Sequence, residues 1–299
     1  MLSSGSHPTV AVVIVTYNSG RVLDMCLECL RRQTRPADLI VIVDNDSPDP
    51  AYLEAVPRTA PFKLERSATN RGFCGGNNIG YGHARGCKYV LFLNPDAFLG
   101  QDFLETAVHW MERSEHASVG CLTGTLLGFD VERREPTGRI DSTGIFQKRH
   151  GRWYDRGKGE TFDATATAAV EDVPAICGAL MFCRTQALEA VLLGNREVFD
   201  ERFFMYKEDI DLSVRLRARG WRLTYVPEFR CHHGRGWQSR AQSTHRSRYL
   251  SARNELRVCA RNRWRGLPYS LAKFVYVALL ERLRLALTAK PAETHRERS

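Results

Sequence analysis

Carboxylates stand where two apolar runs of this chain end. Asp44 follows the run Leu39–Val43, and Asp96 follows the run Tyr89–Leu93 after a break at Pro95. Short runs rich in β-branched and aromatic side chains predict buried strands, and a proline cannot donate to the ladder. Ligands of open α/β sheets bind outside the carboxyl ends of the strands. The sequence therefore predicts a ligand site at this edge of the sheet.

Asp96 has the chemistry that a hard divalent cation requires. Mg²⁺ usually takes one or two protein carboxylates together with oxygens of substrate phosphates. The alternative is structural, since Asn94, Pro95 and Asp96 are also residue types that form turns. The run by itself leaves both interpretations open.

A second acidic cluster, Glu208-Asp-Ile-Asp211, opens a predicted helix that continues to Arg219 and ends at Gly220. Asp211 lies about 200° round a helix from Asp209, so these two carboxylates cannot share one role. Acidic side chains in a first turn also interact favourably with the helix dipole, which is the structural alternative for the cluster.

The glycines of segment 70–78 allow a backbone to approach a ligand closely, since Gly72, Gly75 and Gly76 have no Cβ. A helix from Asn77 to about Arg85 would then have its free N–H groups near a diphosphate. The spacing is not that of a P-loop or a dinucleotide fingerprint. A plain glycine turn is the alternative.

Two histidines are adjacent in the sequence, and two cysteines lie three residues apart. His232 and His233 follow a last predicted strand over 223–226, which Pro227 should stop. Cys26 and Cys29 lie inside a helical pattern with no second cysteine pair, so we interpret them as small core residues rather than zinc ligands.

The predicted elements alternate in the order of an α/β fold. A strand over 10–15, a helix to Gln33 capped by Asn18 or Ser19, and the strand over 39–43 form a β-α-β unit with parallel strands. Residues 128–172 lack periodicity and are expected to form an excursion. The later predicted elements are a helix over 101–113, strands over 119–127 and 173–182, a short helix capped by Thr185, basic helical sequence from about 246, and an amphipathic helix over 267–287.

Length and composition fit a cytoplasmic globular protein. The 299 residues are 43% hydrophobic, which suits one large α/β domain or two small ones. We find no basic-then-apolar leader before the first strand and no apolar run near the ~20 residues of a spanning helix. Nine scattered cysteines, an odd number, argue against a complete disulfide framework.

The net charge of +9 is unevenly placed. Residues 213–299 contain 20 lysines and arginines and 5 aspartates and glutamates, a difference of +15, which leaves about −6 for the first 212 residues. This asymmetry indicates an anionic partner for the C-terminal third: nucleic acid, a membrane surface or a pyrophosphate-bearing substrate. A solvated basic face is the alternative for most of the individual arginines.

The order of these segments resembles family 2 glycosyltransferases with a GT-A fold, and within them the rhamnosyltransferase-like branch. The resemblance covers about residues 9–240. Each matching segment is a modest signal by itself, but all of them in this order are specific to the family. The matching pieces are 13–19, 43–47, 70–73 with 76–78, 93–96, 178–179, 199–206 with 208–211, and Pro227 followed by His233.

The resemblance implies an α/β architecture: a mixed, mostly parallel, Rossmann-like sheet flanked by helices, with a C-terminal helical extension. It places the catalytic domain at 9–240, with a nucleotide-sugar-binding half over 9–127 and an acceptor and catalytic-base half over 128–240. A basic helical extension over 241–288 and a disordered tail over 289–299 would follow.

The family further implies a nucleotide-sugar donor, Mg²⁺ or Mn²⁺, and inversion at the anomeric carbon. A cation balances the charge of the diphosphate leaving group as a Lewis acid. Asp96 resembles the metal-bridging carboxylate of the family's D-x-D element, whose first acidic position is Asn94 here, a departure that leaves fewer negative charges on the metal. His233 resembles the family's late metal or diphosphate ligand, and the adjacent His232 is the alternative.

The remaining donor contacts are implied in the same way. Asp44 resembles the carboxylate that hydrogen-bonds the pyrimidine ring of the donor. The other donor-binding residues implied are Thr16, Tyr17 and Asn18 beside the base, and Arg71, Gly72 and Asn77 near the ribose or diphosphate.

An inverting transfer also needs a base within ~3 Å of the acceptor hydroxyl, on the face opposite the leaving group. Asp209 matches the family's base, and Glu208 is expected to orient the acceptor. Phe203, Tyr206 and Trp221 could stack on sugar faces, with core packing as the alternative.

The reaction expected from the resemblance moves a sugar to a hydroxyl of a glycan or a lipid-linked cell-envelope acceptor. L-Rhamnose from dTDP-rhamnose is the best guess, and UDP-hexoses stay open as donors. The helix over 267–287, with Arg282 and Arg284, could lie peripherally on the inner face of the plasma membrane. Packing on the catalytic domain, or on a second subunit of an oligomer, is the alternative.

Three other functions compete. A sugar nucleotidyltransferase would have a Gly-rich, Lys/Arg-bearing loop where this chain has Thr16-Tyr-Asn18. A non-catalytic nucleotide-sugar-binding protein would not need Asp44, Asp96, Asp209 and His233 together. No recognisable nucleic-acid module accompanies the basic segment, so no nucleic-acid partner is expected.

Overall fold

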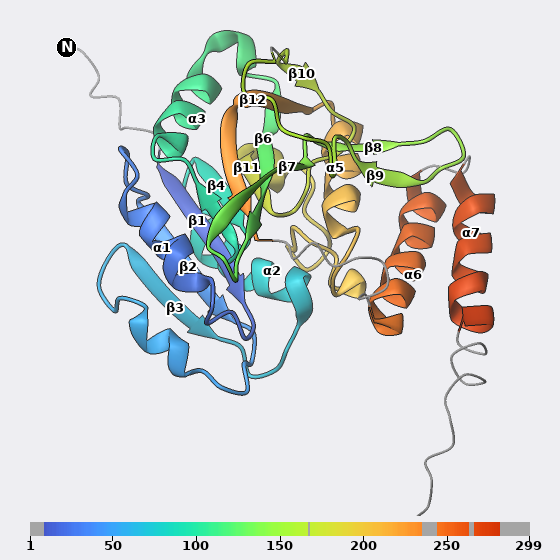
Figure 1. Ribbon diagram of the computed structural model, residues 1–299, viewed down its shortest axis with the longest axis horizontal. Helices are drawn as coiled ribbons and strands as arrows, with labels where there is room; N and C mark the ends of the chain where they lie inside the picture. The colour runs from blue at the N-terminus through green and yellow to red at the C-terminus, as the bar shows by residue number, and fades with distance from the viewer. Residues whose placement is uncertain (1–8, 167, 235–243, 263–265, 282–299) are drawn as a thin grey trace, which may run out of the picture.

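The computed structural model describes residues 9–166, 168–234, 244–262 and 266–281. A ten-stranded mixed sheet runs through its centre in the order β10-β12-β6-β11-β4-β1-β2-β3, with β5 paired to β12 and β7 to β6 (Figure 1). The strands are β1 Val10–Thr16, β2 Leu39–Asp44, β3 Phe62–Arg66, β4 Tyr89–Leu93, β5 Ala97–Leu99, β6 Val119–Asp130, β7 Glu135–Ser142, β10 Glu171–Asp172, β11 Leu180–Arg184 and β12 Arg222–His233; β8 Ile145–Gln147 and β9 Trp153–Asp155 form a separate hairpin.

The N-terminal half of the sheet is parallel, which agrees with the predicted β-α-β unit. β4, β1, β2 and β3 run in one direction, with Ile14 opposite Leu93 and Thr16 opposite Asp44. Every residue of β4 is buried, and β1 and β2 are nearly so, because both faces of these apolar runs are covered. The register brings the ends of β1, β2 and β4 to one edge of the sheet.

Helices flank this sheet, which confirms the predicted fold class. Their bounds are α1 Leu23–Arg31, α2 Gly72–Ala84, α3 Phe103–Glu112, α4 Thr185–Glu189, α5 Glu208–Ala218, α6 His245–Asn262 and α7 Leu267–Val275, which continues as a π-helical segment, Tyr276–Glu281; short 3₁₀ turns are Ala51–Ala55, Ser114–His116 and Glu201–Phe203. In the described ranges, no helix has both the length and the apolar character to cross a membrane. Arg282, Arg284 and the tail lie outside the described residues.

Helix α2 begins at Gly72, so the predicted start at Asn77 is wrong. A Cβ at Gly76 would lie 2.5 Å from Cγ1 of Val15, and one at Gly80 would lie 2.3 Å from Cγ1 of Val13. These glycines therefore let α2 lie directly on β1. Gly76 serves helix–sheet packing here rather than the close approach of a ligand.

The C-terminal half departs from the sequence-based expectations at three strands. The strand predicted over 173–182 forms only as β11, and β6 continues past 127 to Asp130. The expected excursion over 128–172 contains β7 to β10; β7 is half exposed, β10 is exposed, and β8 and β9 have three residues each, so none of them gives an apolar periodicity. β12 does not stop at Pro227, because a register shift between Tyr225 and Arg230 leaves the proline outside the paired positions.

Two predicted caps are also wrong. The carbonyl of Ser19, not its side chain, accepts from the N–H groups of Val22 and Leu23 at the start of α1. The Thr185 hydroxyl donates to the Cys87 carbonyl rather than capping α4. In α1, Cys26 is buried in the core cluster and Cys29 packs against it, as expected.

Candidate active site

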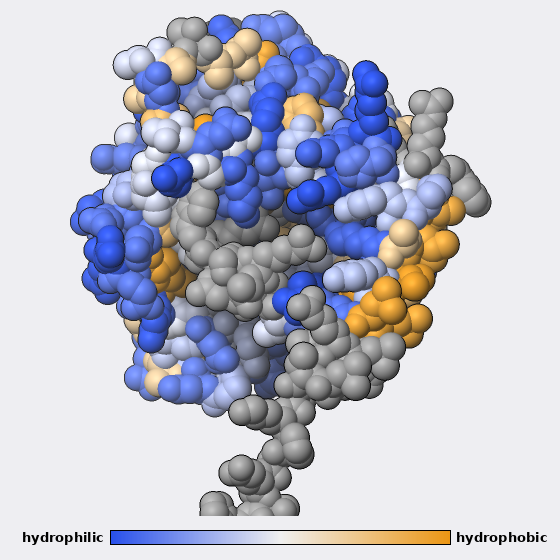
Figure 2. Space-filling view, turned by 45° about the vertical axis from the view of Figure 1, so that its right-hand side comes forward, coloured by the Kyte–Doolittle hydropathy of each residue, from blue (hydrophilic) through white to orange (hydrophobic). Residues whose placement is uncertain are grey.

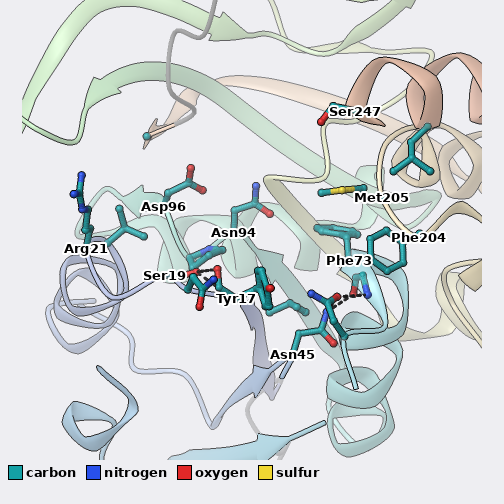
Figure 3. Close-up of a pocket in the computed structure, with 18 of the residues that line it drawn as sticks. Tyr17, Ser19, Arg21, Asn45, Phe73, Asn94, Asp96, Phe204, Met205 and Ser247 are labelled. Atoms are coloured by element: carbon teal, nitrogen blue, oxygen red, sulfur yellow. Dashed lines mark hydrogen bonds between the residues drawn. The ribbon is translucent and has the colours of Figure 1, made fainter. Parts of the chain in front are cut away.

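The ends of β1, β2 and β4 open into a cavity of about 860 Å³, which we call the strand-end cavity. Of the residues predicted to bind the donor, five line it: Tyr17, Asn18, Gly72, Asn94 and Asp96. Figure 3 shows Asn94 and Asp96 pointing into the cavity from the end of β4, with Met205 and Ser247 across from them. The edge of the sheet where the sequence predicts a ligand site therefore borders a cavity, and the carboxylate of Asp96 lines that cavity.

Thr16 and Asp44 lie beside this cavity and are fully buried. The Tyr52 hydroxyl joins them: it lies 2.9 Å from Thr16 Oγ1 and donates to Asp44 Oδ1 at 3.2 Å. Ser47 adds its hydroxyl at 2.9 Å from the Tyr52 oxygen, and its backbone N–H donates to Asp44 at 3.4 Å. Neither Tyr52 nor Ser47 is among the predicted site residues. Ser47 shares the segment 43–47 with Asp44, whereas no short pattern links Tyr52 to it.

Buried amides shape the turn into α2. Asn45 accepts from the Arg71 N–H at 2.9 Å and donates to the Gly72 carbonyl at 2.8 Å, while Asn70 accepts from the Gly72 N–H at 2.9 Å. Gly72 has φ +67°, and a Cβ there would lie 2.3 Å from the Phe204 carbonyl oxygen. A glycine is required at this position, which lines the strand-end cavity.

Arg71 and Asn77, two of the predicted donor-binding residues, both have partners within the protein. The Arg71 guanidinium pairs with Glu201 at 2.5 Å. Asn77 is buried inside α2, where its amide donates to the Phe73 carbonyl at 2.9 Å. Neither residue lines the strand-end cavity, so their contact with ribose or diphosphate stays a prediction.

Asp96 forms a cluster with His233, which is buried at the end of β12. β5 pairs with β12 so that His233 stands opposite Ala97, and the ring Nε2 lies 3.4 Å from Asp96 Oδ1 and 3.3 Å from Asn94 Nδ2. The other ring nitrogen, Nδ1, lies 2.9 Å from Asp141 Oδ2. Since a carboxylate accepts, the Nδ1–H group donates to Asp141, and Nε2 faces Asp96.

Of the adjacent histidines, His233 is therefore the one beside Asp96. The His232 ring instead packs edge-on to Phe129, with centroids 6.0 Å apart, since neighbouring residues of a strand point to opposite faces. Burial lowers the pKa of His232. Burial also acts to lower the pKa of His233, but hydrogen bonds and charges from Asp141 and Asp96 outweigh it and raise that pKa to about 9.

Asp96 and His233 fit a divalent cation that is completed by a substrate. The described residues contain no group of three or more His, Cys, Asp or Glu side chains placed to hold a metal. Two protein ligands suit Mg²⁺ or Mn²⁺ when phosphate oxygens supply the rest. Asp141 would orient the histidine ligand from behind, as carboxylates commonly do at metal sites.

A second cavity, of about 610 Å³, adjoins the first, and we call it the Asp209 cavity. Phe73, Asn94, Asp96, Met205 and Ser247 line both cavities. Asp96 therefore lies at the junction between the strand-end cavity and the Asp209 cavity.

Asp209, in the first turn of α5, accepts from the Gly178 N–H at 3.0 Å and from its neighbour Ile210 at 2.8 Å. Burial raises the pKa of Asp209 above the ordinary aspartate value; the Gly178 N–H and the charge of Lys207 oppose this, and the charge of Asp155 adds to it. A carboxylate with a raised pKa that lines a cavity is suited to accept a proton.

The other two acids of the cluster differ in their surroundings. Glu208 is buried and also lines the Asp209 cavity. Asp211 is buried away from it and pairs with Arg215 at 2.8 Å and Arg261 at 3.3 Å. The expectation that Asp209 and Asp211 cannot share one role agrees with this placement.

The loop before α5 has a strained backbone. Phe204, Tyr206 and Lys207 have φ angles of 64°, 71° and 73°, a region that non-glycine residues rarely occupy. The buried amide of Asn254, from α6, donates to the carbonyls of Phe203, Met205 and Tyr206 at 2.8–2.9 Å. The C-terminal extension therefore holds the loop that delivers Asp209.

The three aromatic residues that could stack on sugar faces differ in their surroundings. Phe203 is fully buried and Trp221 packs against the core, so for these two the structure agrees with core packing. Tyr206 lines the Asp209 cavity, where stacking on a sugar stays a prediction.

Comparison with known proteins places this geometry in a family. The model of glycosyl transferase family 2 matches residues 11–172. The chain belongs to this family.

Two curated relatives align over most of the glycosyltransferase. It is 28% identical to the N-acetylglucosaminyl-diphospho-decaprenol L-rhamnosyltransferase of Mycobacterium tuberculosis, over 80% of this chain and 82% of the relative. It is also 28% identical to the rhamnosyltransferase WbbL of Escherichia coli, over 83% of this chain and 97% of the relative.

Solved structures share the GT-A fold. The mannosyltransferase PcManGT from Pyrobaculum calidifontis, in complex with GDP-Man and Mn²⁺, superposes with a TM-score of 0.55 over 96% of this chain and 77% of that one, at 18% identity. At that identity the likeness supports the fold of this glycosyltransferase and not its substrates.

Proposed function

We propose that this family 2 glycosyltransferase is an inverting, metal-dependent enzyme that moves L-rhamnose from dTDP-rhamnose to a hydroxyl of a lipid-linked or glycan acceptor. The observation that carries the proposal is the position of Asp96. It lies at the junction of two cavities, beside His233, with the carboxylate of Asp209 on the wall of the second cavity. A donor in one cavity and an acceptor in the other would meet there.

The two cavities divide the work of the reaction. In the strand-end cavity, Tyr17, Asn18 and Gly72 would hold the nucleotide, with the buried Asp44 beside them. Asp96 with His233 would hold the cation, which balances the charge of the departing diphosphate when bound. In the Asp209 cavity, an oxygen of Asp209 would accept the proton of the acceptor hydroxyl as that hydroxyl attacks the anomeric carbon. The bond to the diphosphate breaks on the opposite face, so the configuration inverts.

The choice of sugar and acceptor rests on the relatives. Both reported relatives are named rhamnosyltransferases, and the name of one includes an N-acetylglucosaminyl-diphospho-decaprenol, a lipid-linked diphosphate. Arg152, Lys207 and Lys273 line the Asp209 cavity and would suit an acceptor that carries a diphosphate. Transfer of a hexose from a UDP-hexose is the second candidate, since the family resemblance leaves UDP-hexoses open as donors.

A donor panel tests the proposal. Nucleoside diphosphate release would be measured with Mn²⁺ or Mg²⁺ from dTDP-rhamnose, UDP-glucose, UDP-galactose, UDP-N-acetylglucosamine and GDP-mannose, with a polyprenyl-diphosphate-linked N-acetylglucosamine as acceptor. We expect turnover of dTDP-rhamnose that needs the metal and is lost in Asp96→Ala. Turnover of a UDP-hexose alone would assign the second candidate, and full activity after metal removal by a chelator would contradict the metal assignment.

A further inference from the structure

One face of the C-terminal helices is apolar and exposed. Leu271, Val275, Tyr276, Leu279 and Leu280 follow one another at helical spacing along α7 and its π-helical continuation, and we call them the α7 stripe. Their exposed fractions run from 42% for Val275 to 58% for Leu279. Figure 2 shows apolar atoms gathered on the side of the molecule where α7 lies.

The opposite face of the same helix is already occupied. Lys273 forms an ion pair with the buried Glu255 of α6, Val277 is buried, and the Phe274 ring lies 5.6 Å from the Tyr249 ring of α6. Packing on the catalytic domain therefore uses the inner face of α7 and leaves the α7 stripe outside. Contiguous exposed apolar patches often mark interaction sites.

A cluster of positive charge adjoins the stripe. Lys148, Arg149 and Arg152 are exposed at the tip of the β8–β9 hairpin, and no described carboxylate lies within ion-pair distance of any of them. The tip contacts the start of α7, where the His150 and Tyr269 rings are 4.8 Å apart. We call these three residues the hairpin cations.

We propose that the α7 stripe and the hairpin cations together dock this protein on an anionic lipid bilayer. The stripe would enter the boundary between headgroups and acyl chains, and the hairpin cations would lie at the phosphate level beside it. A second copy of the chain fits this face less well. A contact between two copies through the stripe alone would give the hairpin cations no anionic partner, whereas an anionic bilayer would engage both features.

The docked orientation has a consequence for the cavity. Tyr269, Lys273 and Val277 of α7 and its continuation line the Asp209 cavity, as does Arg152 of the hairpin. The element that would lie on the bilayer is thus also a wall of the Asp209 cavity. The docking itself needs no nucleotide or sugar, so its test is separate from that of the proposed reaction.

Vesicle co-sedimentation of the full chain tests the docking. Wild type is expected to bind vesicles that contain phosphatidylglycerol, and to bind pure phosphatidylcholine more weakly. Leu279→Gln/Leu280→Gln should lower the partition coefficient about tenfold by removing apolar contact area. Lys148→Gln/Arg149→Gln should lower it about 25-fold on anionic vesicles, at about fivefold for each charge, and little on neutral ones.

A matched control removes the same charge elsewhere. Arg31→Gln/Arg32→Gln acts on exposed residues at the C-terminal end of α1, on the other side of the molecule in Figure 1, and should bind anionic vesicles like wild type. Equal loss in this control, or wild-type binding by both stripe and hairpin variants, would overturn the proposal. A dimer in sedimentation velocity that Leu279→Gln/Leu280→Gln dissolves, with no vesicle binding by wild type, would assign the stripe to a second copy instead.

Discussion

Asp209 combines two features that rarely meet in a structural carboxylate. It lines a cavity, and burial raises its pKa despite hydrogen bonds from the Gly178 and Ile210 N–H groups. A helix-capping role would require neither the cavity nor the raised pKa. In the sequence, the place of Asp209 in the first turn of the helix allowed a purely structural role, interaction with the helix dipole. In the structure, the same place brings its side chain to the wall of the cavity.

The charges around Asp209 predict opposite shifts in the pH profile. A base must be ionised, so kcat/KM should rise with pH through the pKa of Asp209 in the free enzyme. Asp155 raises that pKa, so Asp155→Asn should move the acidic limb to lower pH. Lys207 lowers it, so Lys207→Asn, whose asparagine tolerates the positive φ, should move the limb to higher pH. Profiles of both variants against wild type check this, and shifts in the same direction would remove Asp209 as the base.

We expect Asp141 to influence metal binding indirectly, through His233. It holds Nδ1 of His233, so Asp141→Asn should weaken activation by Mn²⁺ about 10- to 100-fold. Asp172→Asn, which changes an exposed partner of Arg222 in the same sheet, is the matched control and should leave the activation constant unchanged. An unchanged constant in Asp141→Asn would contradict the positioning role of the Asp141 carboxylate.

At the scale of elements, α6 is part of the site rather than an addition to it. Arg246, Ser247 and Leu250 line the strand-end cavity, and Asn254 holds the strained loop 203–206. Phe204 and Tyr206 in that loop, and Lys207 directly after it, have positive φ angles. Each such angle costs about 1–3 kcal/mol. The hydrogen bonds from α6 offset part of this cost and keep α5 in place.

Asn254→Asp tests this role, because it keeps the side-chain shape and replaces the donating amide with an acceptor that faces three carbonyls. We expect the free energy of unfolding to fall by about 1–3 kcal/mol and kcat to fall about tenfold or more, with nucleotide affinity little changed. Asn78→Asp is the control: Asn78 is a similar anchor, which donates to the Phe199 carbonyl at 2.8 Å. It should lower Tm while the folded enzyme keeps its kcat. Equal kcat in both variants at a temperature well below Tm would leave Asn254 with a structural role only.

At the scale of the whole molecule, much of the basic charge on α6 is used internally. Arg261 joins Asp200 at 2.7 Å and Asp211 at 3.3 Å, and Arg253 donates to the Arg202 carbonyl at 3.2 Å. Part of the excess positive charge in the C-terminal third therefore serves to bind α6 to the catalytic domain. The exposed hairpin cations, outside the basic C-terminal third, are better placed for an anionic partner.

Arg261→Gln should therefore reduce stability more than an exposed pair does. Removing Arg261 leaves two buried carboxylates with one cation each, Arg202 for Asp200 and Arg215 for Asp211, so we expect a loss of about 1–3 kcal/mol. Arg32→Gln, which breaks the exposed pair with Glu28, should cost about 0–1 kcal/mol. Urea unfolding of both variants measures the difference, and equal losses would contradict the internal role of Arg261.

What could be predicted from the sequence depended on how local the signal was. Asp44, Asp96 and Asp209 stand at the ends or beginnings of regular elements, so short patterns revealed them. Asp141 meets His233 across 92 residues, and Asn254 meets Phe203 across 51, so no local pattern could reveal either. The start of α2 and the course of β12 were mispredicted for a related reason: helix–sheet packing decides where Gly76 lies, and a bulge accommodates Pro227.

The most direct test of the central claim is to separate binding from chemistry at Asp96 and Asp209. Calorimetric titration of dTDP in Mn²⁺ would be compared with turnover of the donor for wild type, Asp96→Ala and Asp209→Asn. The account predicts that Asp96→Ala loses metal-dependent binding and turnover, while Asp209→Asn binds dTDP like wild type and loses turnover by a factor of about 100 or more. Full turnover in Asp209→Asn, or unchanged dTDP binding in Asp96→Ala, would contradict it.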